Sequence, residues 1–161
     1  MKISILLPFK ENYSANYAGA VSLFVNDTIN QSIFKNTITV FGNTDYKNFL
    51  SSKYTNIEFK KRLFSSTNKL YVENFLNIEN KINSDLIEIH NRPSYISIIR
   101  KKYHKLLFLF LHNDPLQMNG SRSVDDRINL LQNVDKIIFN SEWCRQRFFD
   151  NFKNKSEYFN K

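Results

Sequence analysis

Polar side chains able to act as acids, bases or hydrogen-bond partners directly follow the most apolar segment of the chain. Residues 106–111 read LLFLFL, and His112, Asn113 and Asp114 come next. A second histidine, His90, closes the apolar run DLIEIH in the same way. An imidazole titrates near neutral pH, so a histidine beside an amide or a carboxylate is suited to proton transfer and to binding polar substrates.

Similar polar sets follow three of the apolar runs. They are His90-Asn91-Arg92, His112-Asn113-Asp114 and Asn140-Ser141-Glu142. One histidine at the end of a strand is as often a surface or capping residue as a functional one. Two histidines at equivalent places favour a functional site, because ligands of open α/β sheets bind outside the carboxyl ends of the strands.

The apolar pattern predicts strands that alternate with helices along the chain. Short apolar or β-branched runs predict strands, and apolar residues at helical spacing predict helices. The expected strands are residues 3–9, 37–41, 56–59, 85–90, 105–111 and 136–139, and the expected helices are residues 20–34, 68–82 and segments that begin near residues 93, 124 and 142. This order implies an α/β fold with a mainly parallel sheet and helices on both faces.

Local signals predict which side chains are buried and how two helices begin. The strand at 105–111 is the most apolar and should lie near the centre of the sheet, covered on both faces. Ser123 and Asp126 resemble a capping box, and Ser141 can cap the last helix. Side chains expected to face the core are Ala20, Leu23, Phe24 and Ile29 in the first helix, Val124, Ile128 and Leu131 in the fourth, and Trp143 and Phe148 in the last.

The composition is that of a globular chain with excess positive charge. Its 161 residues are 42% hydrophobic and 15% aromatic, enough for about one domain with a real core. The net charge of +8 favours anionic partners, although the short basic clusters at 60–62 and 100–102 are more typical of a solvated face. Cys144 is the single cysteine, which excludes an internal disulfide, and we expect it to pack as a small hydrophobe.

No segment indicates export or a membrane span. Pro8 and Lys10 end the first apolar run too early for a signal peptide, and no run approaches the roughly 18 apolar residues of a spanning helix. We therefore expect a cytoplasmic protein, with peripheral contact at the inner membrane face as the one membrane association that the sequence allows.

Several common functional motifs are absent. The loop before Gly19 has neither the dinucleotide-binding glycine pattern nor a P-loop lysine, so an ordinary tight turn is the simpler interpretation of this glycine. His90, His112 and Asp114 could ligate a metal, but they lack the close pair spacing of zinc sites, and we expect no metal. No Gly-x-Ser-x-Gly elbow supports a serine nucleophile.

The order of these segments resembles the N-terminal domain of the retaining glycosyltransferases of family 4, which have the GT-B fold. The resemblance runs from Lys2 to about Phe149. It is carried by ISILLPF with the later AGAV at Gly19, by DLIEIHNRP, by LLFLFLHNDP and by VDKIIFNSEWCRQRF. It implies a Rossmann-like three-layer α/β/α domain over residues 1–155, one half of a GT-B fold.

The resemblance also implies a reaction. A hexosyl-type sugar would move, with retention, from a nucleoside-diphosphate sugar to a glycan or lipopolysaccharide-type acceptor, and no further cofactor is expected. The positive charge would suit phosphorylated acceptors or an anionic membrane surface. The implied roles are contact with the donor sugar near the reacting centre for His112, binding of the donor diphosphate through its backbone N–H for Gly19, acceptor binding for His90, Asn91 and Arg92, and support for Asn113, Asp114, Ser141 and Glu142.

The chain departs from this family in two ways. The first loop has only Gly19, where the family usually has paired glycines. The paired-glutamate motif of the family's C-terminal, nucleotide-sugar-binding domain is not in these residues. We therefore expect a fragment or a truncated product, with little or no transferase activity of its own.

Two other functions are compatible with the sequence. A non-catalytic α/β domain would bind a sugar or a nucleotide without transferring it. A nucleic-acid-binding module would bind generic DNA or RNA with a steep salt dependence. The second is disfavoured because the chain has no recognised nucleic-acid-binding motif, and we expect no nucleic-acid partner.

Overall fold

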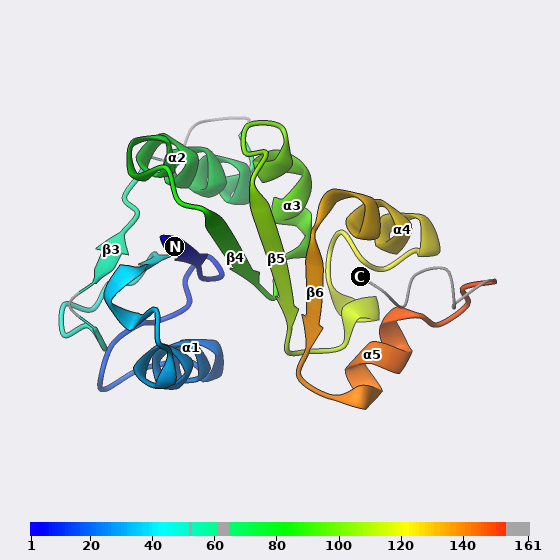
Figure 1. Ribbon diagram of the computed structural model, residues 1–161, viewed down its shortest axis with the longest axis horizontal. Coiled ribbons are helices and arrows are strands. Elements are labelled where there is room, and N and C mark those ends of the chain that lie inside the picture. Colours follow the sequence, from blue (N-terminus) through cyan, green and yellow to red (C-terminus); the bar gives the residue numbers. More distant parts are fainter. Residues whose placement is uncertain (52, 61–64, 154–161) are drawn as a thin grey trace. The chain divides into compact units, whose positions relative to one another are not determined.

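The computed structural model describes residues 1–51, 53–60 and 65–153 (Figure 1). The strands in these ranges are β1 (Ile3–Leu6), β2 (Ile38–Gly42), β3 (Tyr54–Asn56), β4 (Leu86–His90), β5 (Leu106–Leu111) and β6 (Lys136–Phe139). The α-helices are α1 (Ala20–Gln31), α2 (Thr67–Ile82), α3 (Pro93–Arg100), α4 (Val124–Asn133) and α5 (Glu142–Phe148), with short 3₁₀ helices η1 (Lys35–Thr37) and η2 (Pro115–Gln117). The expected alternation of strands and helices is confirmed.

The strands form one sheet in the order β3-β2-β1-β4-β5-β6. The pairs β1–β2, β2–β3 and β5–β6 are parallel. This is the strand order of the doubly wound Rossmann fold, which confirms the expected α/β fold class. The chain divides into two compact units, Met1–Glu88 and Ile89–Lys161.

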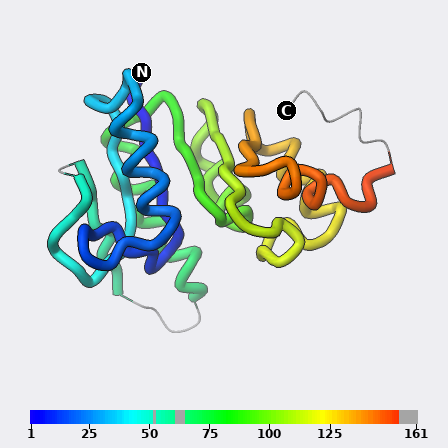
Figure 2. Tube along the Cα trace, turned by 90° about the horizontal axis from the view of Figure 1, so that it is seen from below, coloured from blue at the N-terminus to red at the C-terminus, as the bar shows by residue number. Residues whose placement is uncertain are grey.

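In the first unit, α2 covers the face of the strands that carries Ser4 and Phe41. The Phe41 and Phe75 rings pack edge to face with their centroids 5.1 Å apart. The Ser4 hydroxyl donates a hydrogen bond to the buried carboxylate of Glu79 on α2. Figure 2, which views the molecule from below, shows α1 on the near side of this unit.

The buried face of α1 differs from the expected one. Ala20 is exposed, and Leu23 and Phe24 are 47% and 41% exposed, so the predicted burial of these three side chains is wrong. The side chains that α1 buries are Val21, Ser22, Val25 and Ile29. Val21, Val25 and Ile29 follow one another at four-residue steps and form a β-branched stripe, which takes the core in place of the adjacent stripe of Leu23 and Phe24.

The third strand begins two residues earlier than expected. It covers Tyr54–Asn56 and not residues 56–59, and Tyr54 is paired with Val40 of β2. The Tyr54 ring also stacks on Tyr13 with centroids 5.0 Å apart, so an aromatic contact favours strand structure at this position. Residues 61 and 62 of the expected basic cluster lie outside the described residues, as do the last residues of the expected 1–155 domain.

In the second unit, β5 lies between β4 and β6 and is covered fully on one face only. Leu107, Leu109 and Leu111 are fully buried. Phe108 and Phe110, which point to the opposite face, are half-buried. The expected coverage of both faces is therefore wrong, and the half-buried face places Phe110 beside the polar groups at the end of the strand.

Both expected helix caps of this unit are confirmed. Ser123 and Asp126 form a reciprocal capping box at α4, and Ser141 Oγ accepts the hydrogen bond that caps α5. The core face of α4 is only partly as expected, because Leu131 is buried but Val124 and Ile128 are only half-buried. Arg127 is buried on this helix instead. Its guanidinium donates to the backbone carbonyls of residues 121, 122 and 150, which explains how a cation is tolerated there.

The single tryptophan of the chain does not face the core. Trp143 on α5 is 56% exposed, so its predicted burial is wrong, whereas the predicted burial of Phe148 is confirmed. Cys144 and Phe148, four residues apart, form the buried stripe of this short helix. Cys144 packs as a small buried group, as expected, and burial and nearby Asp114 raise the pKa of its thiol to about 11.

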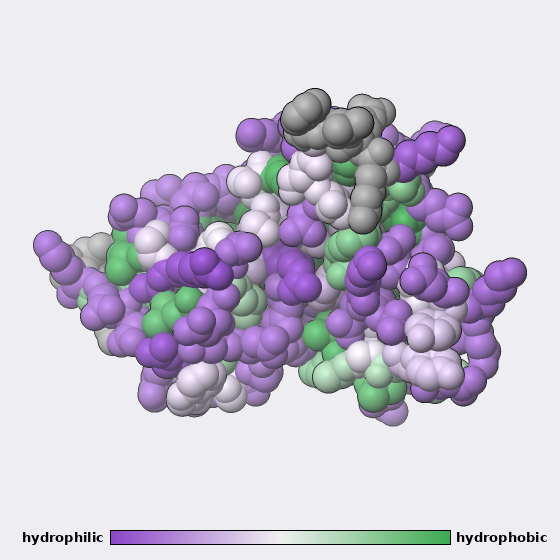
Figure 3. Space-filling model, turned by 180° about the vertical axis from the view of Figure 1, so that it is seen from behind, coloured by the Kyte–Doolittle hydropathy of each residue, from purple (hydrophilic) through white to green (hydrophobic). Residues whose placement is uncertain are grey.

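Within the described residues, no helix combines the length and the apolar character that crossing a membrane requires. The face shown in Figure 3 is largely hydrophilic, and its apolar side chains are exposed in separate patches.

Candidate functional site

Two histidines meet in the second unit where β4 and β5 end. His90 is the last residue of β4, and His112 directly follows β5. His90 Nδ1 and His112 Nε2 are 2.9 Å apart, a hydrogen-bond distance. The two rings are nearly parallel, with centroids 5.2 Å apart, and the His90 ring also stacks on Phe110 at 4.6 Å. One nitrogen of the pair must carry the proton that the other accepts, so the two imidazoles share a proton when both are neutral.

Asn91 fixes the backbone of His112. Its side-chain Oδ1 accepts a hydrogen bond of 2.8 Å from the His112 N–H, and its own N–H donates to the Phe110 carbonyl at 2.9 Å. Asn91 has a φ of 51°, a left-handed conformation that asparagine tolerates better than most residues. Asn140, at the end of β6, donates from Nδ2 to the His112 carbonyl at 2.9 Å. The main chain of His112 is therefore held from both sides.

The surroundings keep the His112 ring neutral at neutral pH. Burial of the ring, and then the nearby His90, lower the pKa of His112 to about 4. His90 is only 1% exposed. A neutral His112 can donate from one ring nitrogen and accept at the other, which suits contact with a hydroxyl group.

The remaining predicted side chains at this edge have local roles. The Arg92 guanidinium donates to the Asn91 carbonyl at 2.8 Å, which keeps it next to the histidine pair. Asp114 caps η2 and pairs with Arg147 at 3.3 Å. The exposed Asn113 accepts a hydrogen bond from the Cys144 thiol through its carbonyl, at 3.4 Å.

Ser141 and Glu142 lie at the start of α5, where Ser141 caps the helix. The exposed Glu142 pairs with Arg145 at 2.8 Å, and hydrogen bonds from Arg145 and Gln146 lower the pKa of its carboxyl. Arg147 lies with its guanidinium carbon 6.0 Å from the centre of the Trp143 ring. Arg147 and Phe110 were not predicted as site residues, and Asn140 was predicted only as a member of a polar set, without a role. The alternation of LLFLFL signals that Phe110 points away from the leucine face, and the polar set after β6 includes Asn140.

In the first unit, a carboxylate lies at the start of α1. Gly19 is the N-cap of α1, and its own N–H donates to the Asn12 carbonyl at 3.2 Å. Glu11 Oε1 accepts a hydrogen bond of 3.2 Å from the Ser22 N–H in the first turn of α1. A Cβ at position 19 would lie 2.0 Å from Glu11 Oε1, so the glycine leaves the room that this carboxylate uses. Sequence reasoning missed Glu11, because nothing in the local pattern links it to the helix.

A cavity of about 440 Å³ lies at the carboxyl ends of β2 and β3 in the same unit. Thr44 and Asn56 line it and bind one another, since the Thr44 N–H donates to Asn56 Oδ1 at 2.9 Å. Tyr46 also lines the cavity, and its ring stacks on Tyr17 with centroids 4.3 Å apart. Both tyrosines are exposed. The cavity thus combines hydroxyl and amide groups with an accessible aromatic pair.

The comparisons with known proteins support the fold. No family model matches the chain, and no curated protein matches its sequence. Among solved structures, the chain is similar to sucrose-phosphate synthase from Thermosynechococcus elongatus, with a TM-score of 0.60 and 13% sequence identity over 92% of this chain. That protein is a GT-B glycosyltransferase. The chain therefore shares the Rossmann-like α/β fold of the matched part of that structure. It spans 44% of the length of that structure.

Proposed function

We propose that these residues form the acceptor-side domain of a retaining, family 4-like glycosyltransferase. The reaction moves a hexosyl-type sugar from a nucleoside-diphosphate sugar to a hydroxyl of a glycan or lipopolysaccharide-type acceptor. The observation that carries the proposal is the arrangement of His112, whose neutral ring follows the end of β5 and is held by Asn91 and His90. The GT-B-type fold supports it.

In this proposal His112 contacts the donor sugar. A neutral imidazole can accept a hydrogen bond from a sugar hydroxyl or donate one to it without adding a charge to the site. We assign His90 a positioning role and not the acceptor-binding role that the resemblance implies, because its ring is buried behind His112 and bonded to it. Asn91 acts through the His112 backbone, and Arg92 remains a candidate for acceptor contact.

The cavity beside Tyr17 and Tyr46 is our candidate for acceptor binding in the first unit. Exposed aromatic rings offer an apolar face, and Thr44 and Asn56 offer hydrogen bonds, which together fit the mixed polarity of a sugar ring.

The donor diphosphate would bind at the start of α1, where Glu11 must first move away. The net charge of +8 and the exposed Leu23 and Phe24 favour peripheral contact with an anionic membrane surface.

The test is a transfer assay on a protein that also contains a nucleotide-sugar-binding domain. We expect His112→Ala to lower kcat by about a thousandfold, in the range of a lost catalytic hydrogen-bonding group. His104→Ala is the matched control, because His104 is exposed and lies in the loop after α3. We expect this control to retain full activity.

Three results would count against parts of this proposal. Full activity of His112→Ala would remove His112 from the reaction. Donor binding without any transfer would favour a non-catalytic binding domain. Turnover by residues 1–161 alone would show that a second domain is not needed.

A further inference from the structure

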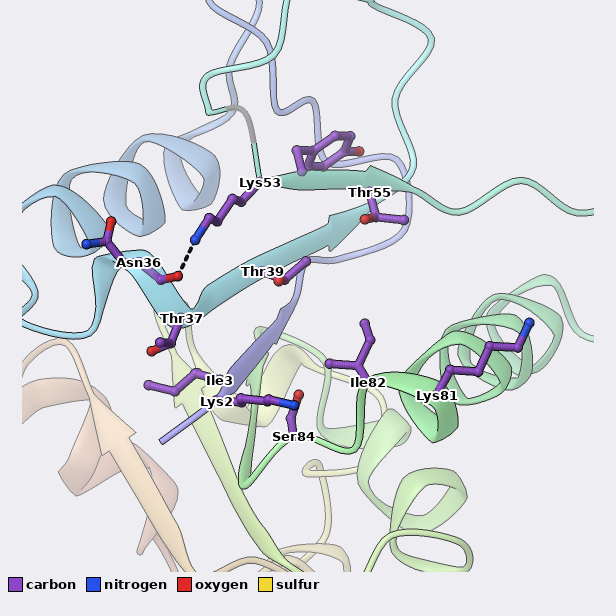
Figure 4. Close-up of a pocket in the computed structure, with 11 residues that line it drawn as sticks. Lys2, Ile3, Asn36, Thr37, Thr39, Lys53, Thr55, Lys81, Ile82 and Ser84 are labelled. Atoms are coloured by element: carbon purple, nitrogen blue, oxygen red, sulfur yellow. Dashed lines mark hydrogen bonds between the residues drawn. The ribbon is translucent and has the colours of Figure 1, made fainter.

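A basic hollow of about 540 Å³ lies in the first unit, away from the carboxyl ends of its strands (Figure 4). Lys2 precedes β1, Lys53 precedes β3 and Ser84 precedes β4. The hollow is therefore at the amino ends of these strands. Ligands of open α/β sheets usually bind at the opposite edge, so this hollow is distinct from the sites described above.

Three lysines and no carboxylate line this hollow. Lys53 donates from its ammonium to the Asn36 carbonyl. In the part of the chain that the structure describes, neither the Lys2 nor the Lys81 ammonium has an ion-pair partner. The lysines give the hollow a positive potential, which an anion bound in it would lower.

The carboxylates nearest in sequence to the hollow already accept hydrogen bonds from groups other than the lysine ammoniums. Asp85 accepts a hydrogen bond of 2.7 Å from the backbone N–H of Lys2. The buried Glu79 accepts from the Ser4 hydroxyl and from the Ser84 N–H. Lys81 lies in the last turn of α2, where its charge offsets the negative end of the helix.

Hydroxyl groups line the floor between the lysines. Thr39 of β2 is paired with Ser4, and Thr55 of β3 is paired with Phe41. Since Ser4 and Phe41 lie on the α2 face, both threonines point to that face as well. Figure 4 shows Thr39 between Lys53 and Lys2, with Thr55 farther along β3.

We propose that this hollow binds a phosphate-bearing anion. A phosphate group carries close to two negative charges and several strong acceptor oxygens, so it can engage ammonium groups and hydroxyls together. The volume admits more than a single phosphate group, as in a phosphorylated sugar or a lipid headgroup. The proposal is independent of the transferase function.

The probe for the test is inorganic pyrophosphate, titrated into the protein while backbone amide NMR shifts are recorded. We expect the amides of Thr39, Thr55 and Ser84 to shift. The double variant Lys53→Gln/Lys81→Gln is expected to weaken binding by about tenfold or more, through loss of two ammonium groups. Lys101→Gln/Lys102→Gln is the matched control, since it removes the same charge from exposed positions after α3.

The double variant removes the contact between Lys53 and Asn36 and could lose binding through misfolding. The single variant Lys2→Gln keeps this contact, so weaker binding of pyrophosphate to it reports on the hollow itself. A second arm uses phosphatidylcholine vesicles with and without phosphatidic acid. Binding to the acidic vesicles that is lost in the double variant identifies a headgroup as the source of the phosphate. Binding of pyrophosphate alone identifies a soluble ligand. The proposal is overturned if neither probe binds in a way that depends on Lys53 and Lys81.

Discussion

The histidine pair of the second unit and the start of α1 in the first unit are built in opposite ways. At the histidine pair, neighbouring side chains hold one another, so that Asn91 and His90 fix His112 before any ligand arrives. At α1, Glu11 already accepts a hydrogen bond from the Ser22 N–H, which an incoming anion would otherwise use. Residues that one family resemblance groups together therefore differ in how ready they are to bind a ligand. The first region is preorganised, whereas the second must exchange one anion for another.

The largest effect on the preorganised region should come from Asn91→Ala. This change removes the hydrogen bond to the His112 N–H and forces alanine into a left-handed conformation. We expect a loss of about 2–3 kcal/mol in the free energy of unfolding, measured with urea. Asn91→Gly keeps the conformation accessible and should cost about 1 kcal/mol less. Equal stability of both variants and the unchanged protein would contradict this account of Asn91.

The stability of the protein should depend on pH through His112. The folded pKa is about 4, below the unfolded value near 6.5, so the unfolded chain binds more protons between these values. The contribution is fully present above about pH 6.5 and is lost as the pH falls toward 4. We expect a loss of about 2 kcal/mol, less than the full shift implies because solvent reaches part of the ring.

Unfolding curves of the protein and of His112→Gln, recorded from pH 7 to pH 4, check this expectation. The difference between the two should shrink as the pH falls, since the variant lacks the group whose pKa is lowered. His90 is coupled to His112, so the shared proton belongs to the pair. Parallel pH profiles of the two proteins would show that the pair does not set this dependence.

At α1, Gly19→Ala should have a smaller effect. The added Cβ would meet the end of the flexible Glu11 side chain, which can swing away but then loses its bond to the Ser22 N–H. We expect a cost of about 1 kcal/mol, similar to the loss of a helix cap. In the background Glu11→Ala, the same glycine change should cost little. A double-mutant cycle without coupling would mean that Gly19 does not serve to accommodate Glu11.

The smallest expected effect tests whether Glu11 competes with other anions at the start of α1. Glu11→Gln keeps an acceptor for the Ser22 N–H but removes the negative charge beside α1. We expect a nucleoside diphosphate to bind about threefold more tightly to this variant, because an anion no longer competes at the helix. NMR shifts of the Gly19 and Ser22 amides would locate the binding. Unchanged affinity for the nucleoside diphosphate would show that the Glu11 charge does not hinder anion binding at the start of α1.

Sequence predicts well what depends on neighbours along the chain. The capping box of Ser123 and Asp126 and the cap at Ser141 were predicted because each partner lies within three residues. The apolar run that ends at His112 likewise predicted a strand. The meeting of His90 and His112 followed from topology, since parallel neighbours end at the same edge. Their hydrogen bond and the lowered pKa of His112 did not follow, because both depend on the placement of single atoms.

Sequence failed where two alternatives had similar local patterns. Leu23 and Phe24 form an apolar stripe as good as that of Val21 and Val25, and only packing against the strands decides between them. Arg127 is charged, and its burial depends on carbonyl groups from distant turns. These contacts join segments that no short-range pattern connects.

Because Trp143 is exposed, its fluorescence can report on changes in its surroundings. It is the one tryptophan in the sequence, so the tryptophan emission of the folded chain comes from a single ring on α5. That ring lies beside Arg147, which pairs with Asp114, two residues after His112. A ligand that draws Arg147 away from Asp114 would change the polarity around the ring and shift its fluorescence. Occupancy of the histidine edge could then be followed in solution without any attached dye.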